Sequence, residues 1–75
     1  KYAVVIGAFR DIGNARRRQS ASYDAGYPAH IVSFRNGLNA VTICPSDSIN
    51  EVLEFLKKNR GTDICPKEAW ILEYK

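Results

Sequence analysis

Side chains capable of covalent chemistry are few in this chain, and their spacing does not form a catalytic group. A hydrolase needs a nucleophile, a general base and a partner that orients the base. The single histidine, His30, lies within a β-rich run and has no pair of acidic residues near it in the sequence. The eight carboxylates are scattered, mostly at the ends of expected helices, where capping or solvation explains them. We therefore expect no catalytic residue and no enzymatic activity.

The two cysteines also lack the sequence surroundings of a metal site. Protein metal sites gather three or four ligands in closely spaced pairs, whereas Cys44 and Cys65 stand far apart. No dinucleotide fingerprint occurs, and the glycine spacing from Gly7 to Gly13 does not suit a phosphate cradle. We expect no metal and no cofactor. The cysteines are expected at opposite ends of a sheet, as two half-buried thiols in preference to a disulfide, which requires Cα atoms within about 7 Å.

Four runs have the composition of β-strands. The first, Tyr2–Phe9, is dense in β-branched and aromatic residues and is typical of a buried strand. Asn36 and Gly37 stand between the second and third runs, and this dipeptide predicts a tight hairpin in which both residues take positive φ. Cys44-Pro45 is expected to end the hairpin. The strands are expected at residues 2–9, 29–34, 38–44 and 69–74.

The first helical segment lies between the first two strands. It is expected to run from an Asn14 cap to about Ala25 and to end at Gly26, which suits a left-handed terminal residue. This helix is poorly amphipathic, because Arg18 and Ser22 occupy positions where a buried stripe would favour leucine.

The second helical segment has clearer signals. Ser48 and Glu51 have the spacing of a capping box, in which each side chain satisfies the other residue's backbone N–H. The basic residues of the last turn favour the negative end of the helix dipole, and Gly61 ends the helix. The apolar stripe is formed by Ile49, Val52, Leu53 and Leu56, and the basic residues are Lys57, Lys58 and Arg60.

One domain accounts for the whole chain. Seventy-five residues suffice for one small hydrophobic core, and the apolar and charged fractions are those of a folded domain. The order of elements is βαββαβ, and right-handed crossovers place such a chain as a four-stranded antiparallel sheet with both helices on one face. We expect an α+β, ferredoxin/RNP-like fold whose other sheet face is open to solvent or to a ligand.

Alternation along the strands assigns side chains to the two faces of this sheet. A solvated face normally carries polar residues, whereas this open face would be apolar and aromatic, which marks an interaction site. Trp70 and Phe34 would act as flat platforms, unless the phase of the last strand is reversed and Trp70 belongs to the core. The helix side is expected to hold Val4, Ile6, Ile31, Val41, Ile43 and Ile71; the open face is expected to hold Val5, Gly7, His30, Val32, Phe34, Ala40, Thr42, Trp70, Leu72 and Tyr74.

The strand, turn and helix motifs together resemble the SPOR domain. The resemblance spans nearly the whole chain, and its most specific part is the opening strand that ends in Gly7-Ala8-Phe9. It implies a SPOR-like domain over residues 1–75, which we expect to be excised from a longer envelope protein because Lys1 directly precedes a strand. The other matching positions are Asn14-Ala15, residues 26–29, Asn36-Gly37, Val41, Ile43, residues 46–56 and residues 69–71.

The resemblance implies a non-catalytic module that binds peptidoglycan. SPOR domains bind, through the open sheet face, glycan strands stripped of their stem peptides, which accumulate at bacterial division sites. Division or cell-wall proteins are implied as further partners, with a periplasmic or cell-envelope location. We expect no nucleic-acid partner. Contact with a membrane is expected only through missing parts of the parent chain, since no run approaches the roughly 18 apolar residues of a span.

The residues expected to contact glycan come from the open face and its margins. A sugar needs flat apolar groups for its C–H surfaces and polar groups for its hydroxyls. The family pattern carries Trp70 over directly, whereas Val5 and Ala8 match only as positions, because glutamine and serine are common there. Asn39 stands where an aromatic residue is common, so either the ligand register has moved or binding is weaker. The candidate set is Trp70, Val5, Ala8, His30, Val32, Phe34, Asn39, Thr42 and Arg10.

Two other functions are compatible with this fold. An RRM-type nucleic-acid module shares the order of elements, but it stacks bases on aromatic residues of its third strand, and residues 38–44 contain none. The net charge of +3 does not choose among acidic polymers. A protein-interaction or oligomerisation domain would pair its apolar face with another sheet or helix, and the missing polar ligand positions favour that alternative.

Overall fold

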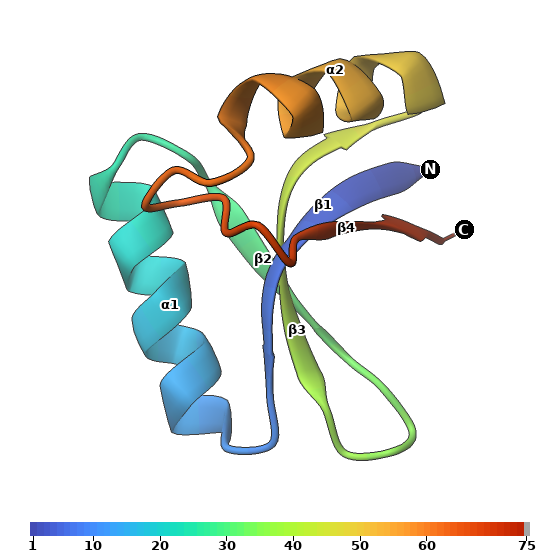
Figure 1. The fold of residues 1–75 in the computed structure, drawn as a ribbon. Helices are drawn as coiled ribbons and strands as arrows, with labels where there is room; N and C mark the ends of the chain where they lie inside the picture. Colours follow the sequence, from blue (N-terminus) through green and yellow to red (C-terminus); the bar gives the residue numbers. More distant parts are fainter. Residues whose placement is uncertain (75) are drawn as a thin grey trace.

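The strands and helices follow the expected order along the chain. The computed structural model describes residues 1–74, and Figure 1 shows its fold. The predicted βαββαβ order and α+β class are confirmed. Within the described residues, no helix has the length and apolar character needed to cross a membrane. The elements are β1 (Tyr2–Phe9), α1 (Ile12–Asp24), β2 (Ala29–Ser33), β3 (Asn39–Ser46), α2 (Ile49–Asn59) and β4 (Trp70–Glu73).

The strands form one antiparallel sheet in the order β2-β3-β1-β4. In Figure 1, α1 runs alongside the sheet and α2 lies over the end where both termini are found. Ala15 of α1 and Val52 and Leu56 of α2 belong to the same buried cluster as side chains of β1 and β3. Both helices therefore cover one face of the sheet, and we call the opposite side the open face.

The core follows the predicted alternation of the strands. Four predicted helix-side residues lie in the buried cluster, and two more pack against it while half-buried: Val4, Ile6, Val41 and Ile43, with Ile31 and Ile71. The poor amphipathicity of α1 has a structural reason, because this helix packs through small side chains. Ser22 is fully buried there, and its Oγ donates to the Tyr27 carbonyl at 2.7 Å.

The N-terminus of α1 differs from its prediction, because Asp11 caps the helix and Asn14 lies inside its first turn. The Asp11 carboxylate accepts from the Gly13 N–H at 2.7 Å, and a carboxylate also suits the positive end of the helix dipole. The predicted C-terminus is confirmed. Gly26 has φ of 92°, and the Tyr27 N–H donates to the Ser22 carbonyl in a Schellman arrangement.

At the start of α2, a relay of hydrogen bonds through Ser46 replaces the direct bond from the Ser48 N–H to Glu51 that a capping box predicts. Ser48 caps the helix by accepting from the Glu51 N–H at 3.4 Å, as expected. The Glu51 carboxylate, however, accepts from Ser46 Oγ at 2.8 Å, and that oxygen accepts from the Ser48 N–H at 3.0 Å. Ser46 Oγ therefore links the Ser48 N–H to the Glu51 carboxylate, and it connects the end of β3 to α2.

The β2–β3 hairpin is present, but its turn type is not the predicted one. Only Gly37, with φ of 87°, is left-handed, and Asn36 does not have positive φ. The Gly37 N–H donates to the Phe34 carbonyl at 3.1 Å, and the Phe34 N–H donates to the Leu38 carbonyl at 2.8 Å. This is a three-residue loop ending in a left-handed glycine, which is the next most common hairpin connection after the two-residue turn.

The pairing of β1 with β3 contains two register irregularities. β3 continues past the predicted stop to Ser46, with an irregularity against β1 at Cys44-Pro45, where Cys44 has φ of 53°. In β1 the shift falls between Val5 and Gly7. A Cβ placed on Gly7 would approach Arg18 of α1 and the Phe9 ring, so Gly7 faces the helices. Its predicted place on the open face is wrong, because a bulge changes the phase of the residues that follow.

Candidate functional site

A single row of side chains crosses the open face through all four strands. His30 of β2 pairs with Thr42 of β3, which in turn pairs with Val5 of β1. Val5 pairs on its other side with Trp70 of β4. Residues directly opposite each other in adjacent strands share a face, so these four predicted site residues lie in one line.

The central strands supply a floor of small side chains to this face. The floor residues Ala3, Val5, Ala40 and Thr42 are at most 2% exposed, and they lie outside the core cluster beneath the helices. The edge strands carry larger groups, His30 and Val32 on β2 and Trp70 and Leu72 on β4. The centre of the open face is therefore nearly closed to solvent, and its larger side chains stand along the two edge strands.

Trp70 is the most prominent aromatic group on the open face. Its side chain is 45% exposed and does not join the core cluster. The alternative in which the phase of β4 is reversed is therefore wrong. Ile71, its neighbour along β4, packs on the helix side as predicted. Exposed tryptophan offers a large flat apolar surface with one N–H donor, which suits stacking on a ring.

A second row carries two more predicted residues. Val32 of β2 pairs with Ala40, and Ala40 pairs with Ala8 of β1. Ala8 is exposed, whereas Val32 is half-buried. Phe34 is half-buried at the hairpin, just beyond the end of β2. Arg10 is exposed just beyond the end of β1.

Asn39 is engaged within the protein. Its Nδ2 donates to the Phe9 carbonyl at 3.1 Å and to the Arg10 carbonyl at 3.3 Å. Its Oδ1 accepts from Ser33 Oγ at 2.8 Å. It pairs with Phe9, which packs towards the helices, so alternation places Asn39 on that side as well. The amide thus joins the ends of β1, β2 and β3, and its hydrogen-bonding capacity is largely used.

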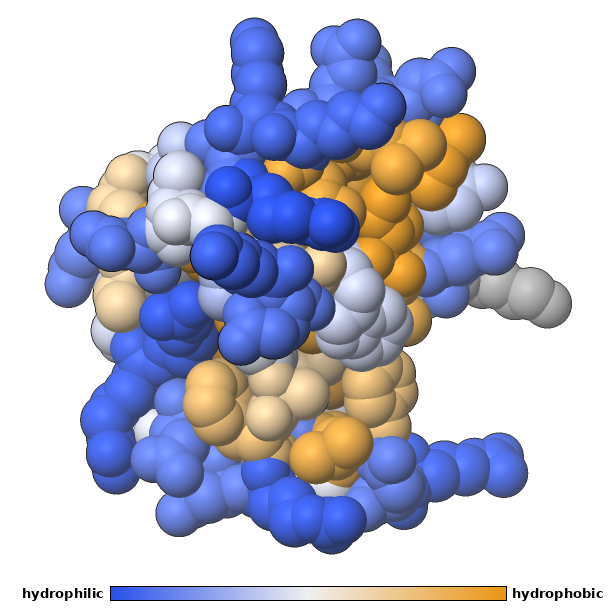
Figure 2. All heavy atoms as spheres, in the orientation of Figure 1, coloured by the Kyte–Doolittle hydropathy of each residue, from blue (hydrophilic) through white to orange (hydrophobic). Residues whose placement is uncertain are grey.

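A cleft of about 140 Å³ lies beside Trp70. One wall is the last part of β1, and the other is the segment that leads into β4. In Figure 2, hydrophobic atoms gather below β4, between α1 and the β2–β3 hairpin, and hydrophilic side chains border them. Pro66 and Glu68 were not predicted as site residues, because nothing in the sequence shows that β4 begins only at Trp70, opposite Val5, while β1 continues to Phe9. The lining residues are Val5, Ile6, Gly7, Ala8, Pro66, Glu68, Ala69 and Trp70.

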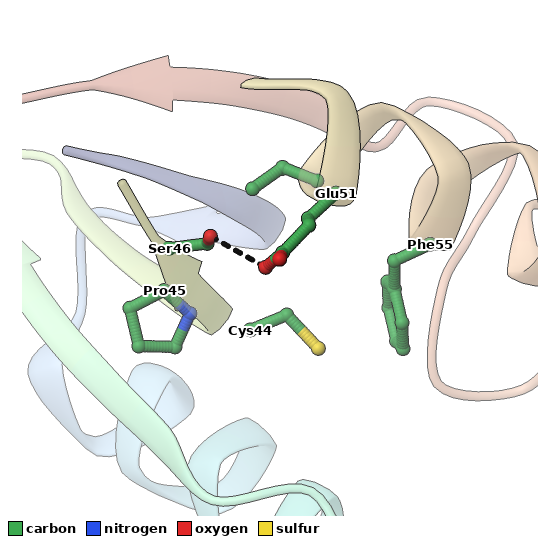
Figure 3. Close-up of a pocket in the computed structure, with 6 residues that line it drawn as sticks. Cys44, Pro45, Ser46, Glu51 and Phe55 are labelled. Carbon is green, nitrogen blue, oxygen red and sulfur yellow. Dashed lines mark hydrogen bonds between the residues drawn. The ribbon is translucent and has the colours of Figure 1, made fainter. Parts of the chain in front are cut away.

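A second cleft, of about 260 Å³, lies between the end of β3 and α2. Figure 3 shows the Cys44 thiol and the Phe55 ring facing this space, with the Ser46–Glu51 hydrogen bond at its edge. Burial raises the pKa of Cys44, and the neighbouring Cys65 raises it further. This thiol is therefore held in its neutral form, which is a poor nucleophile.

Both thiols are free, and their positions differ from the prediction. They lie near enough for the charge of one to raise the pKa of the other, so they are not at opposite ends of the sheet. Cys44 is half-buried as expected, whereas Cys65 is fully buried in the core. Within residues 1–74, no three histidine, cysteine or acidic side chains are grouped as metal ligands.

Comparison with known proteins gives one similar solved structure of known role. No family model and no curated protein matches the chain. The solution structure of the peptidoglycan binding domain of the B. subtilis cell wall lytic enzyme CwlC matches with a TM-score of 0.66 and 28% identity. The match covers 99% of this chain and 89% of that one. The fold expected from the sequence resemblance is thereby confirmed.

Proposed function

We propose that this chain, whose fold is of the SPOR type, is a non-catalytic module that binds the glycan strands of peptidoglycan through its open face. The observation that carries the proposal is the row from His30 to Trp70. It lies across a fold shared at 28% identity with a peptidoglycan binding domain. In this proposal the glycan lies over the floor residues, between the two margins of the face.

The chemistry of the row fits a sugar polymer. The exposed Trp70 ring supplies a flat apolar surface for the C–H faces of a sugar ring. At the other end, exposed His30 supplies ring nitrogens that can donate to or accept from hydroxyls. Thr42 is an unsuitable hydroxyl contact, because it is 2% exposed and its Oγ1 donates to the His30 carbonyl at 3.3 Å. Hydrogen bonds to the sugar hydroxyls would therefore come from residues at the margins of the open face.

The absence of catalysis in this proposal rests on the surroundings of the reactive groups. His30 lies on β2, whereas Cys44 borders a cleft between β3 and α2. A nucleophile and its base must lie within hydrogen-bonding reach, and no hydrogen bond joins these two residues among those of the described chain. The raised pKa of the Cys44 thiol also disfavours its thiolate.

We propose that strands stripped of stem peptides bind best, because a bare strand lets the Trp70 ring approach the sugars. A cell-envelope or periplasmic location and recruitment to division sites follow from that preference. Arg10 and Phe34 are retained as marginal contacts, and Asn39 is assigned to fold stability because its amide is already bonded.

Co-sedimentation with purified sacculi tests this function. Intact and amidase-treated sacculi are compared at low and high salt, with the Tyr23→Ala variant as a control for loss of an exposed aromatic residue on α1. We expect pelleting that increases after amidase treatment and survives salt, since neutral sugar contacts release no counterions. Trp70→Ala is expected to weaken it strongly and Tyr23→Ala to leave it unchanged. No pelleting with either preparation would reject glycan binding and favour protein pairing through the open face.

A further inference from the structure

The cleft beside Trp70 contains a strand edge that has no partner strand. β4 pairs with β1 only from Tyr2 to Val5, whereas β1 continues to Phe9. The segment that leads into β4 forms the opposite wall of the cleft and, in the described chain, makes no backbone hydrogen bond to residues 6–9. A residue in an antiparallel strand directs both its N–H and its C=O to one side. Some of these backbone groups therefore face the cleft.

The strand edge is also unusually bare of side chains. Gly7 has none, and a Cβ there would lie 2.8 Å from the Phe9 ring, so the packing favours glycine at this position. Ala8 is exposed and adds only a methyl group. A ligand can thus approach the backbone of β1 directly, and the wall opposite β1 carries both the exposed Trp70 and the exposed Glu68.

We propose that this cleft receives the acetamido groups of the sugars in a glycan strand. An acetamido group carries one N–H and one C=O, the same pair of groups that a neighbouring β-strand would offer to the edge of β1. The sugar ring that bears it stacks on Trp70, and a hydroxyl of that sugar donates to Glu68. This inference rests on the proposed function and specifies which substituent of the glycan is read.

The size of the cleft agrees with a substituent as its occupant. Its volume of about 140 Å³ is below the roughly 300 Å³ at which pockets for drug-sized ligands begin. An acetamido group fits within this volume, and the sugar ring that bears it would lie outside against Trp70. The cleft shares Trp70 and Val5 with the row across the open face, so a strand lying over that row can place one substituent here.

Two uncharged oligosaccharides test the inference. Chitotetraose carries an acetamido group on every sugar, and cellotetraose has the same linkage with a hydroxyl in its place. Trp70 is the single tryptophan of the chain, so its fluorescence reports binding beside the cleft directly. Two hydrogen bonds of ordinary strength predict that chitotetraose binds about tenfold more tightly than cellotetraose. Equal affinities would overturn the inference, while binding to sacculi would leave the proposed function standing.

A matched pair of variants separates the cleft from the rest of the face. Ala8→Leu places a branched side chain at the bare edge, and Ala21→Leu makes the same change at an exposed position on α1. We expect Ala8→Leu to remove the preference for chitotetraose and Ala21→Leu to keep it. A preference unchanged in Ala8→Leu would also overturn the inference. Stronger pelleting with intact than with amidase-treated sacculi would do the same, since it would assign the strand edge to a stem peptide.

Discussion

His30 and Trp70 stand at opposite ends of one cross-strand row, joined through Thr42 and Val5. Neighbouring strands lie about 4.8 Å apart, so three intervals separate the two ends by roughly 14 Å. A ligand that contacts both residues must therefore lie across the strands of the sheet. Thr42 and Val5 between them are nearly closed to solvent, so these two ends offer the most accessible contacts in the row.

This relationship predicts additive losses of binding. His30→Ala and Trp70→Ala each remove a contact at one end, and residues farther apart than about 10 Å usually contribute independently. We expect the binding free energy lost by the double variant to equal the sum of the single losses within about 0.5 kcal/mol. Titration of amidase-treated sacculi with each variant gives the four values. If His30→Ala binds as the unmodified chain does, the ligand does not reach β2.

The stability of Trp70→Ala tests its place on the open face. The side chain is 45% exposed and lies outside the core, so we expect a loss of about 1 kcal/mol or less in the free energy of unfolding. Ile43→Ala is the control, because Ile43 is fully buried and such truncations cost about 2–5 kcal/mol. Urea unfolding measures both. A loss of about 3–5 kcal/mol in Trp70→Ala would place this residue in the core and reject the proposed face.

The features of the fold that could be predicted are those determined by residues close together in the sequence. Alternation in β1 and β3 identified Val4, Ile6, Val41 and Ile43 as core, because burial on one sheet face imposes a period of two. The left-handed glycine after α1 was also predictable, since Gly26 can adopt positive φ without strain. These features depend on neighbouring residues in the sequence, so the sequence alone was sufficient.

Features that depend on contacts between distant residues were not predictable. The phase change at Gly7 results from a register shift against β3, and no local pattern marks it. The competition between Asp11 and Asn14 for the cap of α1 is decided by how soon the chain leaves β1, although both residue types suit the position. The cleft residues Pro66 and Glu68 were missed for the same reason, since they line the cleft only because β4 begins at Trp70 while β1 continues past Val5.

The role of Asn39 can be separated from ligand binding by one variant. Asn39→Ala removes bonds to the Phe9 carbonyl and to Ser33 Oγ, so we expect a loss of about 1–3 kcal/mol in stability. Ser33→Ala removes only the bond to Asn39 and is expected to cost less. At a temperature where both variants are folded, their binding to sacculi is expected to match that of the unmodified chain. Weakened binding with unchanged stability would instead make Asn39 a ligand contact.

The Ser46 relay predicts coupling between two serines at the start of α2. Ser48→Ala removes the bond to the Glu51 N–H, and Ser46→Ala removes the link to the Glu51 carboxylate. Each is expected to cost about 1 kcal/mol. Because Ser46 also accepts from the Ser48 N–H, the double variant should differ from the sum of the single losses. Urea unfolding of the four chains measures this; strict additivity would contradict the relay.

The buried thiol predicts a loss of stability at alkaline pH. Burial raises the pKa of Cys65 above its usual 9.0, and Arg60 and Arg18 offset part of that rise. A raised pKa means that the folded state retains its proton where the unfolded chain releases it. The resulting stabilisation is fully present below pH 9.0 and is lost as the pH rises through the folded pKa.

Unfolding under reducing conditions at pH 7 and pH 10 tests this linkage. Lysines and tyrosines also titrate in that range, so the comparison is made between the unmodified chain and Cys65→Ala, which share all other groups. Cys65→Ala is less stable at pH 7 because it leaves a small cavity in the core. We expect the gap to narrow at pH 10, since only the unmodified chain loses the thiol's contribution. A gap that stays constant would show that Cys65 has the same pKa in the folded and unfolded states.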